Sequence, residues 1–127
     1  MSPEDKFDSD ESELTLARLL DRDDSVLKWL RPAPNEFNIT YNRGKRYEPD
    51  FVVETADCCY LVEVKGENKL TDPDVLDKKK RGIQYCDVST RWYKANGYKP
   101  WRYLFIPSKQ VLPNSSFAQL AKRFQEQ

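Results

Sequence analysis

The chain has 127 residues, enough for one domain with its own hydrophobic core and too few for two domains of ordinary size. Charged residues make up 33% of it, but three Trp, seven Tyr and six Phe supply large apolar areas and favour a folded domain over disorder. The sequence contains no histidine, the commonest general base and transition-metal ligand, so any catalysis must use carboxylates, lysine, tyrosine or cysteine.

Nothing in the sequence suggests a membrane or an oxidising compartment. No apolar run approaches the roughly 18 residues that cross a bilayer, and the polar N-terminus lacks the apolar stretch of a signal peptide. The three cysteines, Cys58, Cys59 and Cys86, form neither a disulfide framework nor a zinc-binding spacing. We expect a cytoplasmic protein with reduced cysteines and no membrane partner.

Charge is unevenly distributed along the chain, although its net value is zero. Residues 1–24 contain nine acidic and three basic side chains, whereas residues 25–127 contain twelve acidic and eighteen basic ones. The basic excess of the second part suits a polyanionic partner, but an excess of this size is also common in proteins that bind no nucleic acid.

The N-terminal third predicts a tail followed by a helix. Residues 1–11 are acidic without apolar periodicity, which predicts a disordered tail or linker and leaves 12–127 as the domain. Ser12 is a good N-cap for a helix carrying Leu16, Leu19 and Leu20, and Ser25 is expected to cap a short turn that ends at Leu30.

The middle of the chain predicts three strands. Residues 37–41 alternate as a strand, 42–44 have turn chemistry, and strands are expected over 47–55 and 59–64. A long helix should follow, with Asp72 as N-cap, Pro73 in the first turn and Gly97 as its stop.

Residues 101–106 alternate as a fourth strand, and Ser116 is expected to cap a C-terminal amphipathic helix. The expected order is αβββαβα, an α/β fold whose mixed, mostly antiparallel sheet is flanked by helices. We identify no internal repeat.

A two-residue turn at Ala56-Asp57 sets the register of the hairpin formed by strands 47–55 and 59–64, because it pairs Thr55 with Cys58. Asp50 then lies opposite Glu63. Alternation along the strands places Asp50, Glu63 and Lys65 on one face with Val52 and Leu61, and leaves a wholly hydrophobic face that must lie on the core.

Two carboxylates opposite each other repel, so this arrangement needs a compensating cation. Mg²⁺ prefers hard oxygen ligands such as Asp50 and Glu63, completed by water and phosphate oxygens, and Mn²⁺ is expected to substitute for it. Lys65 points to the same place and could orient a water or neutralise charge on a phosphodiester. The alternative is an ordinary half-exposed strand with its charges facing water.

The stretch Tyr47-Glu48-Pro49-Asp50-Phe51-Val52-Val53 and the stretch Tyr60-Leu61-Val62-Glu63-Val64-Lys65-Gly66 resemble the PD-(D/E)XK nucleases. Within them the chain is most similar to the C-terminal endonuclease domain of type III restriction enzyme subunits and to helicase-fused nucleases. The resemblance implies a restriction-endonuclease-like αβββαβ core, to which this chain adds a C-terminal helix.

The same resemblance implies Mg²⁺-dependent hydrolysis of DNA that leaves a 5′-phosphate, with catalytic residues Asp50, Glu63 and Lys65. The metal ligands it implies are Asp50, Glu63 and the Val64 backbone carbonyl, with Glu13 matching a first-helix carboxylate that some members direct at a metal. A glutamate in the first turn of a helix is also a favourable partner for the helix dipole.

Basic residues on the second helix and in the first hairpin turn are candidates for DNA contact, namely Lys79, Lys80, Arg43 and Lys45. Solvated basic surfaces explain the same residues. Possible partners besides DNA are a helicase or translocase motor and a second copy on DNA. The alternatives to a restriction-type nuclease are a resolvase or transposon-type endonuclease and a catalytically inactive module that binds DNA or docks a protein.

Overall fold

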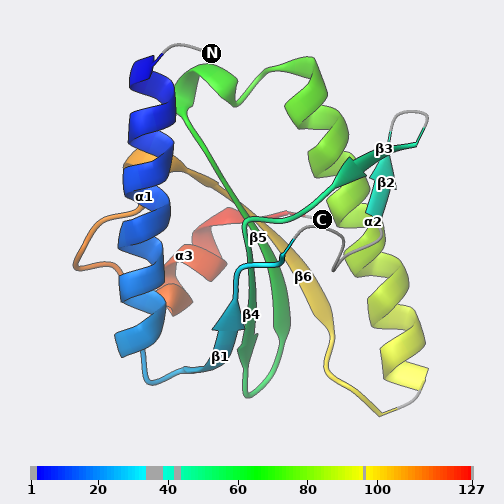
Figure 1. The fold of residues 1–127 in the computed structure, drawn as a ribbon. Helices are drawn as coiled ribbons and strands as arrows, with labels where there is room; N and C mark the ends of the chain where they lie inside the picture. Colours follow the sequence, from blue (N-terminus) through cyan, green and yellow to red (C-terminus); the bar gives the residue numbers. More distant parts are fainter. Residues whose placement is uncertain (1–2, 34–38, 42–43, 96, 127) are drawn as a thin grey trace.

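The computed structural model describes residues 3–33, 39–41, 44–95 and 97–126. Within these ranges a mixed sheet is flanked by three helices, which confirms the expected α/β class (Figure 1). The sheet has the strand order β1 (Val26–Leu30), β4 (Phe51–Thr55), β5 (Cys59–Lys65), β6 (Trp101–Pro107) and β7 (Gln125–Glu126). Strands β5 and β6 run parallel, and the other neighbours pair antiparallel.

Helices cover both faces of this sheet. Helices α1 (Pro3–Arg22) and α3 (Phe117–Phe124) lie on one face, and α2 (Pro73–Ala95) lies on the other (Figure 1). A second, two-stranded sheet of β2 (Ile39–Tyr41) and β3 (Lys45–Tyr47) packs beside α2. Short 3-10 turns follow β5 at Glu67–Lys69 and β6 at Ser108–Gln110.

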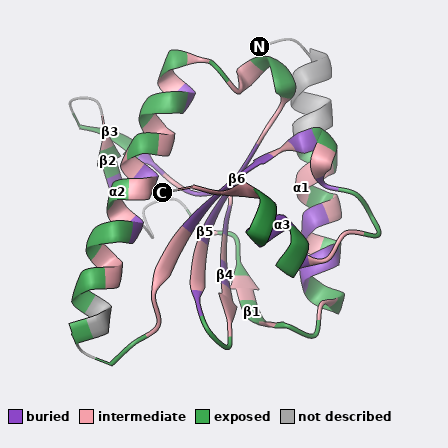
Figure 2. Ribbon diagram, turned by 180° about the vertical axis from the view of Figure 1, so that it is seen from behind, coloured by how far each residue is buried: buried purple, intermediate pink, exposed green. Residues whose placement is uncertain are grey.

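Each face of the sheet has its own hydrophobic cluster, and the buried residues follow the sheet through the centre of the molecule (Figure 2). Burial of this apolar area is the main favourable term for folding. On the α1 and α3 side, alternate residues of the central strands meet the helix leucines: Phe51, Val53, Val62, Val64, Leu104 and Ile106 face Leu16, Leu19, Leu20, Phe117 and Leu120. On the α2 side the cluster contains Ile39, Tyr47, Leu61, Val75, Cys86, Tyr103 and Phe105.

The predicted hairpin register is confirmed. The amide of Thr55 donates to the Cys58 carbonyl at 2.9 Å, and Phe51 pairs with Val62 across β4 and β5. The predicted hydrophobic face lies on the α1 and α3 core. The other face, which carries Glu63, is also covered, because α2 and the β2–β3 sheet pack on it.

Both ends of α2 and the start of α3 agree with the sequence. The Asp72 carboxylate accepts hydrogen bonds from the amides of Asp74 and Val75 at 2.9 and 3.2 Å, and Gly97 adopts a φ of 79° after the last turn of α2. Ser116 and Gln119 form a capping box at α3. None of the helices in the described ranges is long and apolar enough to cross a membrane.

Three predicted segments differ from the structure. The turn expected after Ser25 is strand β1, because residues 26–30 find hydrogen-bond partners on the edge of β4, and such tertiary pairing overrides local preference. The strand predicted over 47–55 is split into β3 and β4 where the chain passes from one sheet to the other, at Glu48–Asp50, and Pro49 cannot donate to a ladder there. Of the strand predicted over 37–41, residues 37 and 38 lie outside the described ranges.

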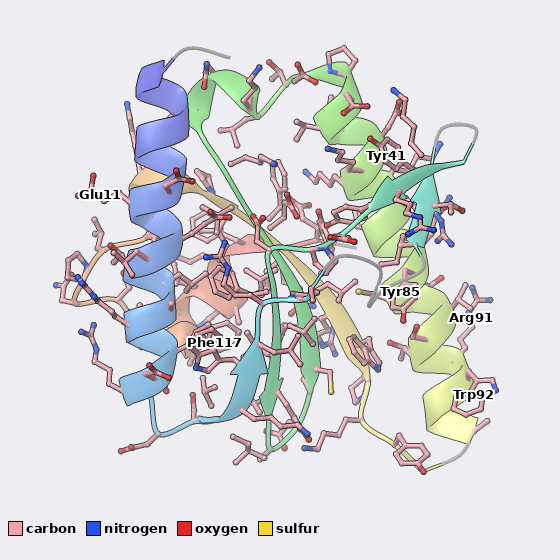
Figure 3. The ribbon with its side chains drawn as sticks, in the orientation of Figure 1. Glu11, Tyr41, Tyr85, Arg91, Trp92 and Phe117 are labelled. Carbon is pink, nitrogen blue, oxygen red and sulfur yellow. The ribbon has the colours of Figure 1, made fainter. Side chains whose placement is uncertain are left out.

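The N-terminal helix begins at Pro3 rather than at Ser12, so residues 3–11, expected to be disordered, are helical. A helix already anchored by its leucines extends without paying the cost of nucleation again. The side chain of Trp92 projects from the C-terminal half of α2 and is 58% exposed (Figure 3).

Candidate metal and catalytic site

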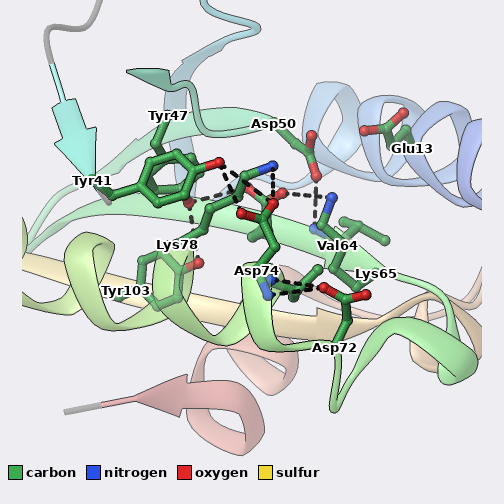
Figure 4. A network of polar contacts seen from close by, with 12 residues as sticks. Glu13, Tyr41, Tyr47, Asp50, Val64, Lys65, Asp72, Asp74, Lys78 and Tyr103 are labelled. Atoms are coloured by element: carbon green, nitrogen blue, oxygen red, sulfur yellow. Dashed lines mark hydrogen bonds and ion pairs between the residues drawn. The ribbon is translucent and has the colours of Figure 1, made fainter. Parts of the chain in front are cut away.

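Asp50 lies at the point where the chain enters β4, directly after the buried Pro49. Its Oδ2 accepts a hydrogen bond from the Val64 amide at 2.8 Å (Figure 4). Burial, and then the charge of Glu63, raise the pKa of Asp50 to about 7, although the Val64 amide and Lys65 act in the opposite direction. The structure therefore holds this carboxylate firmly in a place where its negative charge is costly.

Glu63 is 4% exposed and is one of two buried polar residues among those described. Its Oε1 lies 3.1 Å from Lys65 Nζ, and its Oε2 accepts a hydrogen bond from the Tyr47 hydroxyl at 3.1 Å. Burial raises the pKa of Glu63, and the neighbouring Lys65 partly offsets this. The buried Glu63 and the half-buried Asp50 thus lie at the same end of the hairpin, as its register predicted.

Lys65 is at the end of β5, and about a quarter of its side chain is exposed. Burial alone would lower the pKa of Lys65, but the carboxylates of Glu63 and Asp50 outweigh burial and raise it. Its amine is therefore an ammonium at neutral pH. In that state it is a hydrogen-bond donor and a positive charge, and it does not accept a proton.

Glu13 extends from α1 towards Asp50 (Figure 4). Burial raises the pKa of Glu13 to about 7, and the nearby charge of Asp50 adds to the effect. On its other side Glu13 Oε2 lies 3.3 Å from the Arg31 guanidinium. The structure thus places the Glu13 carboxyl group near Asp50, and the same carboxyl group also pairs with Arg31.

These residues fit a hard divalent cation. In the described part of the chain no three His, Cys, Asp or Glu side chains are grouped closely enough to form a complete metal site. Mg²⁺, however, commonly binds one or two carboxylates and takes its other ligands from water and substrate. Asp50 and Glu63 supply that number of carboxylates, and the Val64 carbonyl lies between Glu63 and Lys65 in the chain.

The residues predicted to contact DNA differ in their surroundings. Lys79 Nζ is 3.0 Å from Glu126 and 4.7 Å above the Phe105 ring, so it faces the C-terminal strand. Lys80 is exposed on α2, and Lys45 is exposed on β3 with Asp74 at 3.9 Å. Arg43 lies outside the described residues.

Sequence reasoning missed two tyrosines beside Glu63. Besides its bond to Glu63, the Tyr47 hydroxyl lies 3.1 Å from that of Tyr103, and both side chains are buried (Figure 4). Tyr47 comes from β3 and Tyr103 from β6, which pairs with β5 in parallel. Alternation along residues 101–106 could have placed Tyr103 on a definite face, but its neighbours depend on that pairing.

A second polar group that the sequence did not indicate joins α2 to the β2–β3 sheet. Asp74 accepts from the Tyr41 hydroxyl at 3.3 Å and lies 3.6 Å from Lys78 Nζ (Figure 4). Lys78 also lies 5.8 Å above the Tyr41 ring, and its charge acts on Glu63. This group holds the β2–β3 sheet, and with it Tyr47, against α2.

No protein-family model matches the chain, and no curated protein sequence or solved structure matches it either.

Proposed function

We propose that this protein is a metal-dependent endonuclease that hydrolyses phosphodiester bonds of DNA, in the manner of the PD-(D/E)XK nucleases. One observation carries the proposal: the buried Glu63 and the half-buried Asp50 lie together at the end of a β-hairpin with the Lys65 ammonium against Glu63. Buried like charges cost stability, so a site that gathers them suits a divalent cation better than it suits a purely structural role.

In this proposal Asp50 and Glu63 hold Mg²⁺ or Mn²⁺ together with the Val64 carbonyl. The bound ion would supply an acidified water and a polarised phosphoryl group. Lys65, held at Glu63 with its end still partly open to solvent, donates a hydrogen bond to the attacking water or to a phosphate oxygen. Glu13 acts through Asp50, since its carboxyl donates a hydrogen bond to that residue when protonated.

A second candidate function is a non-catalytic module that binds DNA or docks a partner. The observation in its favour is that, among the described residues, every buried side-chain nitrogen or oxygen has a hydrogen-bond partner without any metal. Because the buried polar groups satisfy one another in this way, a structural role for Glu63 and Lys65 is compatible with the structure.

The deciding experiment is cleavage of supercoiled plasmid and of short duplexes with Mg²⁺ or Mn²⁺. It compares the native chain with Asp50→Asn and Lys65→Ala at equal purity. We expect metal-dependent cutting that both substitutions abolish. Asp50→Asn removes a metal ligand and should weaken metal binding strongly. Lys65→Ala keeps both carboxylate ligands, so it should still bind metal, with only the smaller loss that follows from losing its contact with Glu63.

Matched controls come from the opposite end of the hairpin, at Glu54, and from its partner Lys28 on the neighbouring strand β1. Glu54→Gln removes a β4 carboxylate that pairs with Lys99 and Lys28, and Lys28→Ala removes an exposed ammonium. Both controls should cut like the native chain. Cutting that persists in Asp50→Asn would point to a contaminant or a different site, and a folded native chain that neither binds metal nor cuts would favour the non-catalytic module.

A further inference from the structure

The buried hydroxyls of Tyr47 and Tyr103 form a chain of hydrogen bonds that ends on Glu63. Tyr47 donates to Glu63 Oε2 at 3.1 Å, and its oxygen lies 3.1 Å from the hydroxyl of Tyr103. Tyr47 is 2% exposed and Tyr103 is 1% exposed. With Lys65 on Oε1, both oxygens of the Glu63 carboxylate have a defined partner.

Gly82, in the middle of α2, allows this arrangement. A Cβ at this position would lie 2.4 Å from Cε2 of the Tyr103 ring and 2.8 Å from its Cδ2, closer than real Cβ contacts come. The φ of Gly82 is that of an ordinary helical residue, so the glycine is not there to permit a left-handed turn. Glycine weakens a helix interior, and the close approach of the Tyr103 ring is the physical reason for it here.

The sheet register completes the chain of contacts. In the parallel pairing of β5 and β6, Tyr103 is opposite Leu61 and Phe105 is opposite Glu63, so the Tyr103 side chain is on the α2 side with Glu63. Tyr47 reaches the same point from β3, which α2 holds in place through the contact of Asp74 with Tyr41. Strands β3 and β6, distant in the sequence, thus place Tyr47 on Glu63 Oε2 and Tyr103 behind Tyr47.

We propose that Tyr47 and Tyr103, with Gly82 giving them room, are positioning residues that orient the Glu63 carboxylate for a divalent cation. The inference rests on the proposed function, because it names what the oriented carboxylate binds. Tyr47 fixes Oε2 and Lys65 fixes Oε1, and each carboxylate oxygen keeps a further lone pair with which it could bind a cation beside Asp50. Partners that orient a metal ligand are commonly needed for full affinity.

The test measures Mg²⁺ and Mn²⁺ binding to the full chain by titration calorimetry, without DNA. The variants are Tyr47→Phe, Tyr103→Phe and Gly82→Ala, and the matched control is Tyr60→Phe, a half-buried tyrosine on the opposite face that packs on Phe117. We expect Tyr47→Phe to weaken metal binding roughly 10-fold or more. Gly82→Ala should do the same by displacing Tyr103, Tyr103→Phe should have a smaller effect, and Tyr60→Phe should have none.

The thermal midpoint of each metal-free variant separates positioning from a general loss of stability. Positioning lowers metal affinity in molecules that remain folded, and in cleavage assays it lowers kcat while the KM for DNA stays constant. Gly82→Ala also perturbs packing, so Tyr47→Phe is the decisive variant. If the Tyr47→Phe variant is folded and binds metal as tightly as the native chain, the inference is overturned and the proposed function stands. If the native chain binds no metal, both the inference and the proposed function are contradicted.

Discussion

Asp50 Oδ2 and the backbone amide of Val64 are joined by a hydrogen bond of 2.8 Å across the β4–β5 hairpin. This bond continues the pairing of the two strands beyond Phe51 and Val62, with a side chain in place of a backbone carbonyl. It fixes one candidate metal ligand on the same residue whose carbonyl is proposed as another. Because an amide donor favours the charged form of a carboxylate, the bond also offsets part of the rise in the pKa of Asp50 that burial causes.

Asp50→Asn should stabilise the metal-free protein while removing metal binding. The amide oxygen of asparagine can still accept from Val64, and the substitution removes a desolvated charge next to Glu63. We expect the free energy of unfolding at pH 8 with EDTA to rise by about 1 to 2 kcal/mol, as relief of a charge burial of this kind allows. Urea unfolding checks this, and a clear loss of stability would show that the Asp50 charge is well compensated without metal.

Stability of the metal-free protein should fall as pH rises from about 4.5 to about 7. Burial raises the pKa values of Asp50 and Glu13 to about 7, from the ordinary values of 3.8 and 4.5 that these side chains have in an unfolded chain. In that window the folded state holds protons that the unfolded state has released. Each unit by which pH rises therefore lowers the free energy of unfolding, until both groups are ionised in the folded state. Thermal midpoints across pH 4.5 to 8 in EDTA check this direction.

Mg²⁺ should reverse that trend, because a cation binds the ionised carboxylates and competes with their protons. The increase in thermal midpoint on adding Mg²⁺ should be larger at pH 8 than at pH 5.5. At a concentration of 100 times its Kd the ion would contribute about 2.7 kcal/mol. Asp50→Asn is the control, and an equal Mg²⁺ effect in that variant would place the ion elsewhere.

Ser116→Ala should lower stability without changing metal affinity. Ser116 Oγ accepts from the Gln119 amide at 3.2 Å at the start of α3, which packs on the sheet face opposite Glu63. Loss of such an N-cap costs about 1 kcal/mol. Urea unfolding and metal titration measure the two effects separately. Ser116→Asp should restore most of the stability, because aspartate also caps helices well.

Lys79 and Lys80, adjacent on α2, should behave differently towards DNA. Lys80 is exposed, so Lys80→Ala should reduce the salt dependence of DNA binding by about one unit of slope. Lys79 is engaged by Glu126 and Phe105, so Lys79→Ala should leave the slope unchanged and cost less than about 1 kcal/mol of stability. Fluorescence anisotropy at several salt concentrations checks both, and an equal drop in slope for the two variants would mean that Lys79 leaves Glu126 to bind phosphate.

The features that followed from the sequence depend on neighbours along the chain. Ala56-Asp57 is a two-residue turn, and strand side chains alternate with period two, so the register of the hairpin and the place of Asp50 near Glu63 followed from counting. Asp72, Gly97 and Ser116 marked helix ends for the same reason, since a cap acts on amides within its own first or last turn.

Tertiary structure decided what surrounds that hairpin. Residues 26–30 became strand β1 only because the edge of β4 offered them partners, and Glu63 became buried only because α2 and the β2–β3 sheet cover its face. Tyr47, Tyr103 and Gly82 meet through a parallel strand pairing and a helix contact between segments distant in the chain. Local pattern therefore identified the charged residues of the candidate site, whereas long-range packing set their burial, their pKa values and the hydroxyls that orient them.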